Sequence, residues 1–174
     1  MGPTAGRSWH RAGGALSVYA MKHALCALAL SLSLAAALAL PAVAQGPAET
    51  VTVGGAGKTT TFTVELANTK PAAEAGLAGR ASLAKDRGLL IDYRKLGEPA
   101  SPTMKGVTIG LDMLFLGPDG TITGIIQYAR PGSLRPLWTG LGWVATMEIP
   151  AGQVAALGIK TGEKVRGKLF GNGG

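Results

Sequence analysis

The stretch that most constrains the fold is residues 107–126, VTIGLDMLFLGPDGTITGII. Two apolar runs flank residues 117–120 (GPDG), where proline presets φ and glycine closes a tight turn without steric cost. This pattern predicts a β-hairpin of two apolar strands. Because side chains alternate along a strand, one face of the first strand carries Val107, Ile109, Leu111, Met113 and Phe115, and the other carries Gly110, Asp112, Leu114 and Leu116.

Short β-branched runs separated by glycine and proline continue along the chain. They predict a hairpin over 50–53 and 59–66, a short helix capped by Asn68 or Thr69, and a second short turn over 82–86. They also predict strands over 89–91 and 144–149, a helix over 153–157, and a last hairpin over 159–161 and 164–170. We therefore predict a mainly β (α+β) fold. It is a compact single domain, either an antiparallel sheet or a small, partly closed barrel of about seven strands with one or two short helices.

The N-terminal region has the composition of an export signal. A basic start at Lys22, an apolar run over Ala24–Leu40 and an Ala-x-Ala site ending at Ala44 describe a secretory signal peptide. We assign residues 1–20 to an extended or non-native N-terminus, 21–44 to the signal peptide, 45–58 to a linker and first strand, 59–170 to the domain and 171–174 to a flexible tail. The expected location is the periplasm, or the membrane surface if Ala24–Leu40 stays uncleaved as an anchor.

Residues 45–174 contain neither histidine nor cysteine, because His10, His23 and Cys26 all precede them. A Cys/His zinc site, a disulfide framework and the usual Ser-His or Cys-His catalytic sets are therefore excluded from this part. Its net charge is +4, since only three of the 17 basic residues and none of the ten acids lie upstream. This charge is too low for a nucleic-acid binder. We expect no metal, no cofactor and a monomer.

The order of several short motifs resembles a known family. The motifs are Phe62–Ala67, Gly76-Leu77 with Arg80, Gly88–Leu90, Met104, Leu111–Phe115 before Asp119-Gly120, Met147–Gly152, and Gly158-Ile159 with Gly162. Over roughly residues 60–167 the chain is similar to the family catalogued as domain of unknown function 192, whose members are often exported. The resemblance implies a compact β-rich domain with a short helix near its start, and it implies no known chemistry.

The chain departs from the family pattern at three places. Ala78 stands where methionine is usual, residues 88–91 read GLLI instead of GMLF, and residues 104–107 read MKGV instead of Met-x-Asn-Thr. The last change removes polar groups that would border Asp112, so a family site at that position would be altered here.

Asp112 is the first candidate for a functional residue, because it is a carboxylate within an apolar strand. Such a group must be hydrogen-bonded, paired or protonated. One hypothesis makes Asp112 a ligand-binding or acid–base group beside Arg80, Met104 and Lys105. The structural alternative is a carboxylate satisfied by loop amides or by Arg80, which would join a helical segment to the sheet.

The second candidate is the glycine-rich segment 134–143. Trp138 and Trp143 could stack on a sugar ring or an apolar side chain, or they could cover an open end of the barrel. Alternation also places Lys164, Arg166 and Lys168 on one face of the last strand, where basic residues more often protect an exposed edge than bind anions. Partial matches to a P-loop at residues 57–59 and to penicillin-recognising enzymes at residues 82–85 and 160–162 lack the remaining elements of both motifs.

Three functions remain open at this point. The preferred one is a non-enzymatic binding or accessory module of the cell envelope, which uses the Trp segment and the region of Asp112 and Arg80 to bind an envelope ligand or protein. The second is a small hydrolase or lyase with Asp112 as general acid or base, helped by Glu65 or Glu148. The third is a purely structural envelope protein. Membrane contact is expected only through an uncleaved signal segment.

Overall fold

The computed structural model describes residues 46–55, 57–96 and 101–173. The predicted N-terminal extension and signal peptide lie outside the described residues, as does Gly174. Within the described part, no helix is long and apolar enough to cross a membrane.

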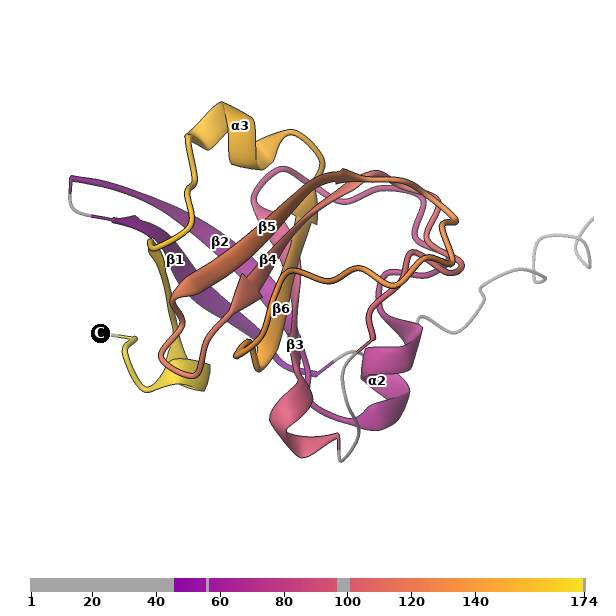
Figure 1. Cartoon of the computed structure of the whole chain (residues 1–174), viewed down its shortest axis with the longest axis horizontal. Helices are drawn as coiled ribbons and strands as arrows, with labels where there is room; N and C mark the ends of the chain where they lie inside the picture. The colour runs from indigo at the N-terminus through magenta and orange to yellow at the C-terminus, as the bar shows by residue number, and fades with distance from the viewer. Residues whose placement is uncertain (1–45, 56, 97–100, 174) are drawn as a thin grey trace, which may run out of the picture. The chain divides into compact units, whose positions relative to one another are not determined.

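Seven strands form one strongly curled sheet in the order β5-β4-β6-β3-β2-β1-β7 (Figure 1). The strands are β1 (Ala48–Gly55), β2 (Lys58–Ala67), β3 (Arg87–Asp92), β4 (Leu111–Leu116), β5 (Ile122–Ala129), β6 (Ala145–Pro150) and β7 (Lys164–Arg166). The helices are α2 (Lys70–Ala75) and α3 (Gln153–Leu157), and the 3-10 turns are η1 (Tyr93–Lys95) and η2 (Lys168–Phe170). The prediction of a mainly β single domain is confirmed.

The two edge strands of this sheet meet at one end. Thr121, next to β5, forms a β-bridge with Lys164 of β7. The Ile122 amide donates to the Glu163 carbonyl at 2.8 Å, and the Val165 amide donates to the Gly120 carbonyl at 2.8 Å. The sheet is therefore a half-barrel that is closed only at this end.

The β4–β5 hairpin forms as predicted. The Gly120 amide donates to the Gly117 carbonyl at 3.0 Å, and Gly120 has a φ of 81°, which glycine adopts without strain. The strand β4 begins at Leu111 rather than near Val107. Residues 107–110 lie outside the strand, where the Val107 carbonyl accepts from the Gly132 amide at 2.9 Å.

The predicted alternation of side chains along β4 is observed, and the two faces of this strand belong to different core clusters. Leu114 and Leu116 belong to one cluster with Ile149 and Val154, which lies under α3. The other cluster contains Leu111, Met113 and Phe115 with Leu89, Ile91, Leu77 and Met104, and it lies on the side of α2. Every residue of β4 is buried, because both faces of the strand are covered.

One strand pair is parallel, within a sheet that is otherwise antiparallel. Strands β2 and β3 pair in parallel, with Val64 opposite Gly88. The connection between them carries α2, which follows the general rule that parallel neighbours need a crossover. As expected, Thr69 caps α2, and the helix has Pro71 in its first turn and Gly76 at its C-terminal cap.

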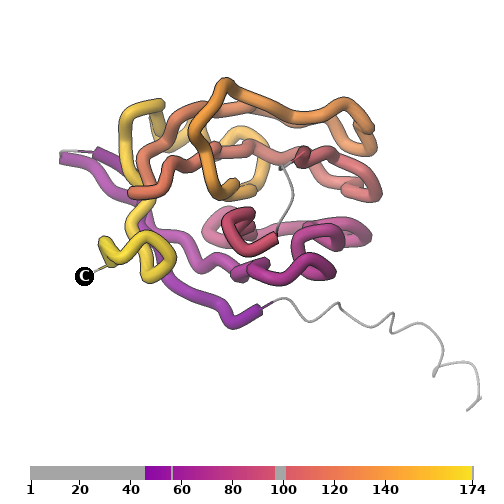
Figure 2. The backbone as a smooth tube through the Cα atoms, turned by 60° about the horizontal axis from the view of Figure 1, so that its bottom comes forward, coloured from indigo at the N-terminus to yellow at the C-terminus, as the bar shows by residue number. Residues whose placement is uncertain are grey.

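The short turn predicted over residues 82–86 is present, since the Arg87 amide donates to the Ala84 carbonyl at 3.0 Å. One sequence-based prediction about local structure is wrong: the final hairpin is absent. Residues 159–163 pack against the end of α3 and against β5, β7 pairs with β1, and residues 168–170 form η2 (Figure 2). Lys168 therefore lies beyond the strand that was predicted to align it with Lys164 and Arg166.

The Thr69 cap gives a first testable prediction. Thr69 Oγ1 accepts from the Ala72 amide at 3.4 Å, at the start of a helix only six residues long. We expect Thr69→Ala to lower the free energy of unfolding by about 1 kcal/mol, as measured by urea denaturation. Thr69→Ser keeps the acceptor and should retain most of this stability. Equal losses in the two variants would contradict a capping role.

Candidate functional site

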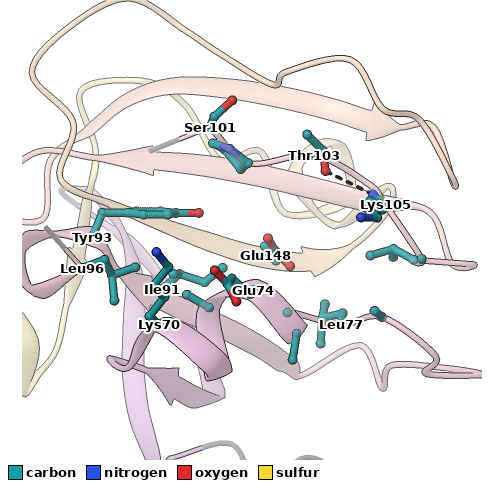
Figure 3. Close-up of a pocket in the computed structure, with 17 residues that line it drawn as sticks. Lys70, Glu74, Leu77, Ile91, Tyr93, Leu96, Ser101, Thr103, Lys105 and Glu148 are labelled. Atoms are coloured by element: carbon teal, nitrogen blue, oxygen red, sulfur yellow. Dashed lines mark hydrogen bonds between the residues drawn. The ribbon is translucent and has the colours of Figure 1, made fainter. Parts of the chain in front are cut away.

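A cavity of about 670 Å³ lies between the sheet and the segments that cover its α2 face. Its walls come from α2 and the turn after it, from Ile91 of β3, from η1 and from residues 101–107. The apolar lining includes Leu77 and Val107. Figure 3 shows these elements arranged around Glu148, which β6 supplies from the centre of the sheet.

Glu148 is the charged group at the floor of this cavity. On β6 it lies opposite Leu89 of β3 and Met113 of β4, and its neighbours Met147 and Ile149 point to the other core cluster. Only 6% of its surface is exposed. Burial raises the pKa of Glu148 to about 7. Among the described residues, no amide or side chain donates a hydrogen bond to its carboxyl group. Within the described ranges Glu148 is therefore a buried carboxyl without a hydrogen-bond donor, and it lines the cavity.

Tyr93 forms the wall next to Glu148, and an aromatic cluster holds its ring. The Trp143 ring meets Tyr93 edge-on at 5.6 Å and 79°, and it meets Phe115 edge-on at 5.0 Å and 73°. The Tyr93 amide donates to the Val144 carbonyl at 3.0 Å. Burial is the main cause that raises the pKa of the Tyr93 phenol, and the nearby charge of Glu148 adds to it. In Figure 3 the hydroxyl end of Tyr93 points toward the cavity.

Polar side chains surround the rim of the cavity. Lys70 and Glu74 come from α2, and Ser101, Thr103 and Lys105 come from the segment opposite (Figure 3). The Lys105 amide donates to Thr103 Oγ1 at 3.3 Å. A mainly apolar wall with a few polar groups is the usual composition of a small-molecule site.

The glycine-rich segment 130–143 supports this wall from outside. The Met104 amide donates to the Ser133 carbonyl at 3.0 Å, and the Leu137 amide donates to the Pro102 carbonyl at 2.8 Å. These two bonds attach residues 102–104 to the segment that carries both tryptophans. The irregular segment therefore has a structural role in positioning the cavity.

The structure places Asp112 away from this cavity. Asp112 lies opposite Ile149 in the β4–β6 register, whereas its neighbour Met113 lies opposite Glu148, so the two carboxyl groups face opposite sides of the sheet. Asp112 is fully buried. One of its oxygens accepts from the Tyr128 amide and the other from the Val154 amide, both at 2.9 Å. These bonds join β4 to β5 and to the first turn of α3.

The residues predicted to accompany Asp112 lie elsewhere. Arg80 makes a two-point ion pair with Glu65, with its Nη1 atom 2.6 Å from Glu65 Oε1. Lys105 lines the cavity, and Met104 is buried in the core cluster beside it. The predicted grouping of Asp112 with Arg80, Met104 and Lys105 is therefore wrong, because Asp112 projects to the other face of the sheet.

The two tryptophans occupy different environments. Trp143 is partly buried against Tyr93 and Phe115, whereas 61% of the Trp138 surface is exposed. The structure thus separates the two rings into a packing residue and a surface residue.

Sequence reasoning considered Glu148 only as a helper of Asp112, and it did not select Tyr93, Glu74, Ser101 or Thr103. The available signal was the same for both acids, since Glu148 also interrupts an apolar run, ATMEIP. The residues around Asp112 and Glu148 do not indicate which acid accepts hydrogen bonds from main-chain amides and which one lines a cavity. Among the described residues there is no group of three or more His, Cys, Asp or Glu side chains placed to hold a metal ion.

Comparison with known proteins gives the following relatives. The chain is similar to a protein of Sinorhizobium meliloti 1021 described as a "putative transcription regulator", with 35% identity and a TM-score of 0.67, over 72% of this chain and 97% of that one. It is also similar to a protein of unknown function from Novosphingobium aromaticivorans DSM 12444, with 34% identity and a TM-score of 0.67, over 76% of this chain and 94% of that one. No match was found among curated proteins.

The family model described as "DUF192: Uncharacterized ACR" matches residues 50–167. This range contains most of β1, all of β2 to β7, α2 and α3, and thus the buried residues of both core clusters and the cavity. The resemblance found in the sequence is confirmed, and the chain belongs to the DUF192 family.

Proposed function

We propose that this protein is a small-molecule-binding module and that its binding site is the cavity around Glu148. We further propose that it works in the cell envelope after export, an inference that rests on the apolar run of Ala24–Leu40 and the Ala-x-Ala site that follows it. The ligand is a compound small enough for a cavity of about 670 Å³.

Glu148 is the observation that carries this proposal. A buried carboxyl without a partner costs stability, because burial penalises its charged form. An apolar residue at the same central position of β6 would pack against Leu89 and Met113 without this penalty. Residues that are retained at the expense of stability are typical of functional sites. The cavity next to Glu148 supplies the space in which a ligand can meet that carboxyl.

A second candidate function is acid–base catalysis in the same cavity. A carboxyl group with a pKa of about 7 is suited to proton transfer at neutral pH. The role in catalysis that the sequence suggested for Asp112 is less well supported, because both of its oxygens already accept main-chain hydrogen bonds. Chemical conversion of a bound compound would favour catalysis, whereas stoichiometric binding without conversion favours the module.

The binding site can be tested with a fragment set of neutral, cationic and anionic compounds, followed by NMR of the amide groups and indole N–H groups. We expect the bound fragments to shift the resonances of α2, Tyr93 and Lys105, and to leave the Trp138 indole unchanged. Ala73 lines the cavity, so Ala73→Phe should fill part of it and weaken binding at least tenfold.

Trp138→Ala is the matched control, because it removes an exposed ring outside the cavity. This variant should bind the fragments as the unchanged protein does. Shifts confined to the Trp138 segment, or no binding by any class of fragment, would refute the proposal for the cavity.

A further inference from the structure

We propose that the ligand is an organic amine, bound with its ammonium group between Glu148 and the Tyr93 ring, and that it carries an acidic group at its other end, which Lys105 binds at the rim. This inference rests on the proposed function of the cavity and names the chemical class of its ligand. An aliphatic ω-amino acid is the simplest compound of this class.

The Glu148 carboxyl group at the floor of the cavity is a hydrogen-bond acceptor that a ligand donor could satisfy. Glu148 is 94% buried, given its exposure of 6%, and it borders open space. Burial is the cause of its raised pKa. A ligand ammonium group would neutralise this carboxylate, with charge-assisted hydrogen bonds.

The Tyr93 ring favours the same kind of group. The electron-rich face of an aromatic ring attracts a cation within about 6 Å of its centre. Tyr93 and Glu148 line the same cavity, and the hydroxyl end of Tyr93 points toward this cavity (Figure 3). Because Trp143 holds the Tyr93 ring edge-on, the ring is already ordered before a ligand arrives. A carboxylate beside a fixed aromatic ring is a suitable site for an ammonium group.

The rim of the cavity favours an acidic group of the ligand, in contrast to the floor. Lys105 lines the cavity from the 101–107 segment, together with the hydroxyl groups of Ser101 and Thr103. In Figure 3 Lys105 and Tyr93 lie on opposite sides of Glu148. A simple amine leaves the Lys105 charge unused, whereas a ligand with a carboxylate at its far end pairs with it. The cavity thus offers an acidic floor and a basic, hydroxyl-bearing rim to one elongated ligand.

The test uses four probes with the same five-carbon skeleton: 5-aminopentanoate, pentylamine, 1-pentanol and pentanoate. Calorimetry at pH 7.5 should rank 5-aminopentanoate first and pentylamine second, with each at least about tenfold tighter than 1-pentanol and pentanoate. Pentanoate binding as tightly as pentylamine would overturn the inference, because the lysines of the rim would then dominate recognition.

The pH dependence provides a second readout. Among the residues that the structure describes, the charged and titratable groups that line the cavity with Glu148 are Tyr93 from η1, Lys70 and Glu74 from α2 and Lys105 from the opposite segment. Glu65 of β2 is paired with Arg80. Pentylamine is cationic throughout the range from pH 5.5 to pH 8, and the proposed binding requires an ionised Glu148. Its affinity should therefore rise about tenfold per pH unit below pH 7 and level off above it. An affinity that is constant from pH 5.5 to pH 8 would contradict the assignment.

Two variants separate the parts of the site. Glu148→Gln keeps the shape of the side chain and should weaken pentylamine at least tenfold and remove its pH dependence. An unchanged circular dichroism spectrum shows that the variant is folded. Lys105→Met should leave pentylamine unchanged and remove the preference for 5-aminopentanoate. A preference that survives in this variant would rule out Lys105 as its source.

The same measurements distinguish a wrong ligand class from a wrong binding site. If cavity resonances respond to neutral or anionic fragments but not to the amines, the module stands and the ligand class is wrong. If none of the four probes and no fragment shifts those resonances, both are wrong.

Discussion

Replacing Asp112 with asparagine is expected to lower the free energy of unfolding by about 3 kcal/mol. The Asp112 carboxylate accepts two main-chain hydrogen bonds in a fully buried position, from Tyr128 and Val154. Hydrogen bonds to a charged group contribute about 1.5–3 kcal/mol each. Asparagine can accept only one of the two bonds, and its amide NH₂ group must face the other N–H donor.

The positions of these two donors make the loss severe. Tyr128 has a φ of 54°, unusual for a residue other than glycine, and the pairing of β4 with β5 changes register between Leu111 and Met113. The Asp112 carboxylate accepts the hydrogen bond of the Tyr128 amide at this irregular position. Its second bond holds the first turn of α3, a helix of five residues that is too short to be stable by itself. Asp112 thus compensates for a strained strand and anchors a helix.

Urea denaturation followed by circular dichroism measures this effect, and the thermal midpoint should fall by roughly 10 °C. Asp86→Asn is the matched control, because Asp86 is exposed and the same chemical change should leave the midpoint nearly unaltered. If Asp112→Asn unfolds at the same urea concentration as the unchanged protein, the two amides do not depend on the carboxylate. Asp112 would then again be a candidate ligand-binding group.

Local patterns in the sequence predicted most of the elements of this fold. The GPDG turn, the Thr69 cap and the helix from Gln153 to Leu157 all form as expected, since each depends on neighbouring residues. The errors concern partners that are distant in the chain. Nothing in residues 164–166 indicates pairing with β1, more than a hundred residues earlier, and nothing in β2 or β3 indicates their parallel pairing.

The candidate site illustrates the same limit. Alternation predicted correctly which side chains of β4 share a face, but it could not say what covers each face. Asp112 meets the amides of β5 and α3, whereas Glu148 meets a cavity whose walls come from α2, η1 and residues 101–107. Both acids interrupt apolar strands in the same way. Only the three-dimensional arrangement distinguishes the carboxylate with two amide donors from the one without a donor.

The stability of the protein should therefore depend on pH through Glu148. Its pKa is about 7 in the folded protein and near 4.5 when it is exposed in the unfolded chain. Between these values the folded state holds a proton that the unfolded state has released, so the free energy of unfolding decreases as the pH rises. This difference between the two pKa values corresponds to about 3 kcal/mol of unfolding free energy, which is lost mostly between pH 4.5 and pH 7. This contribution is fully present below pH 4.5 and absent above pH 7.

Comparison with Glu148→Gln isolates this contribution. Glu49, whose pKa burial raises, and Asp119, whose pKa the bond from Lys164 lowers, also change the pH profile, but they do so equally in both proteins. The difference in unfolding free energy between the two proteins should shift by about 3 kcal/mol in favour of Glu148→Gln from pH 4.5 to pH 8. A constant difference would mean that Glu148 titrates normally. If the difference does shift, Glu148 lowers stability at neutral pH, which fits a group that requires a ligand.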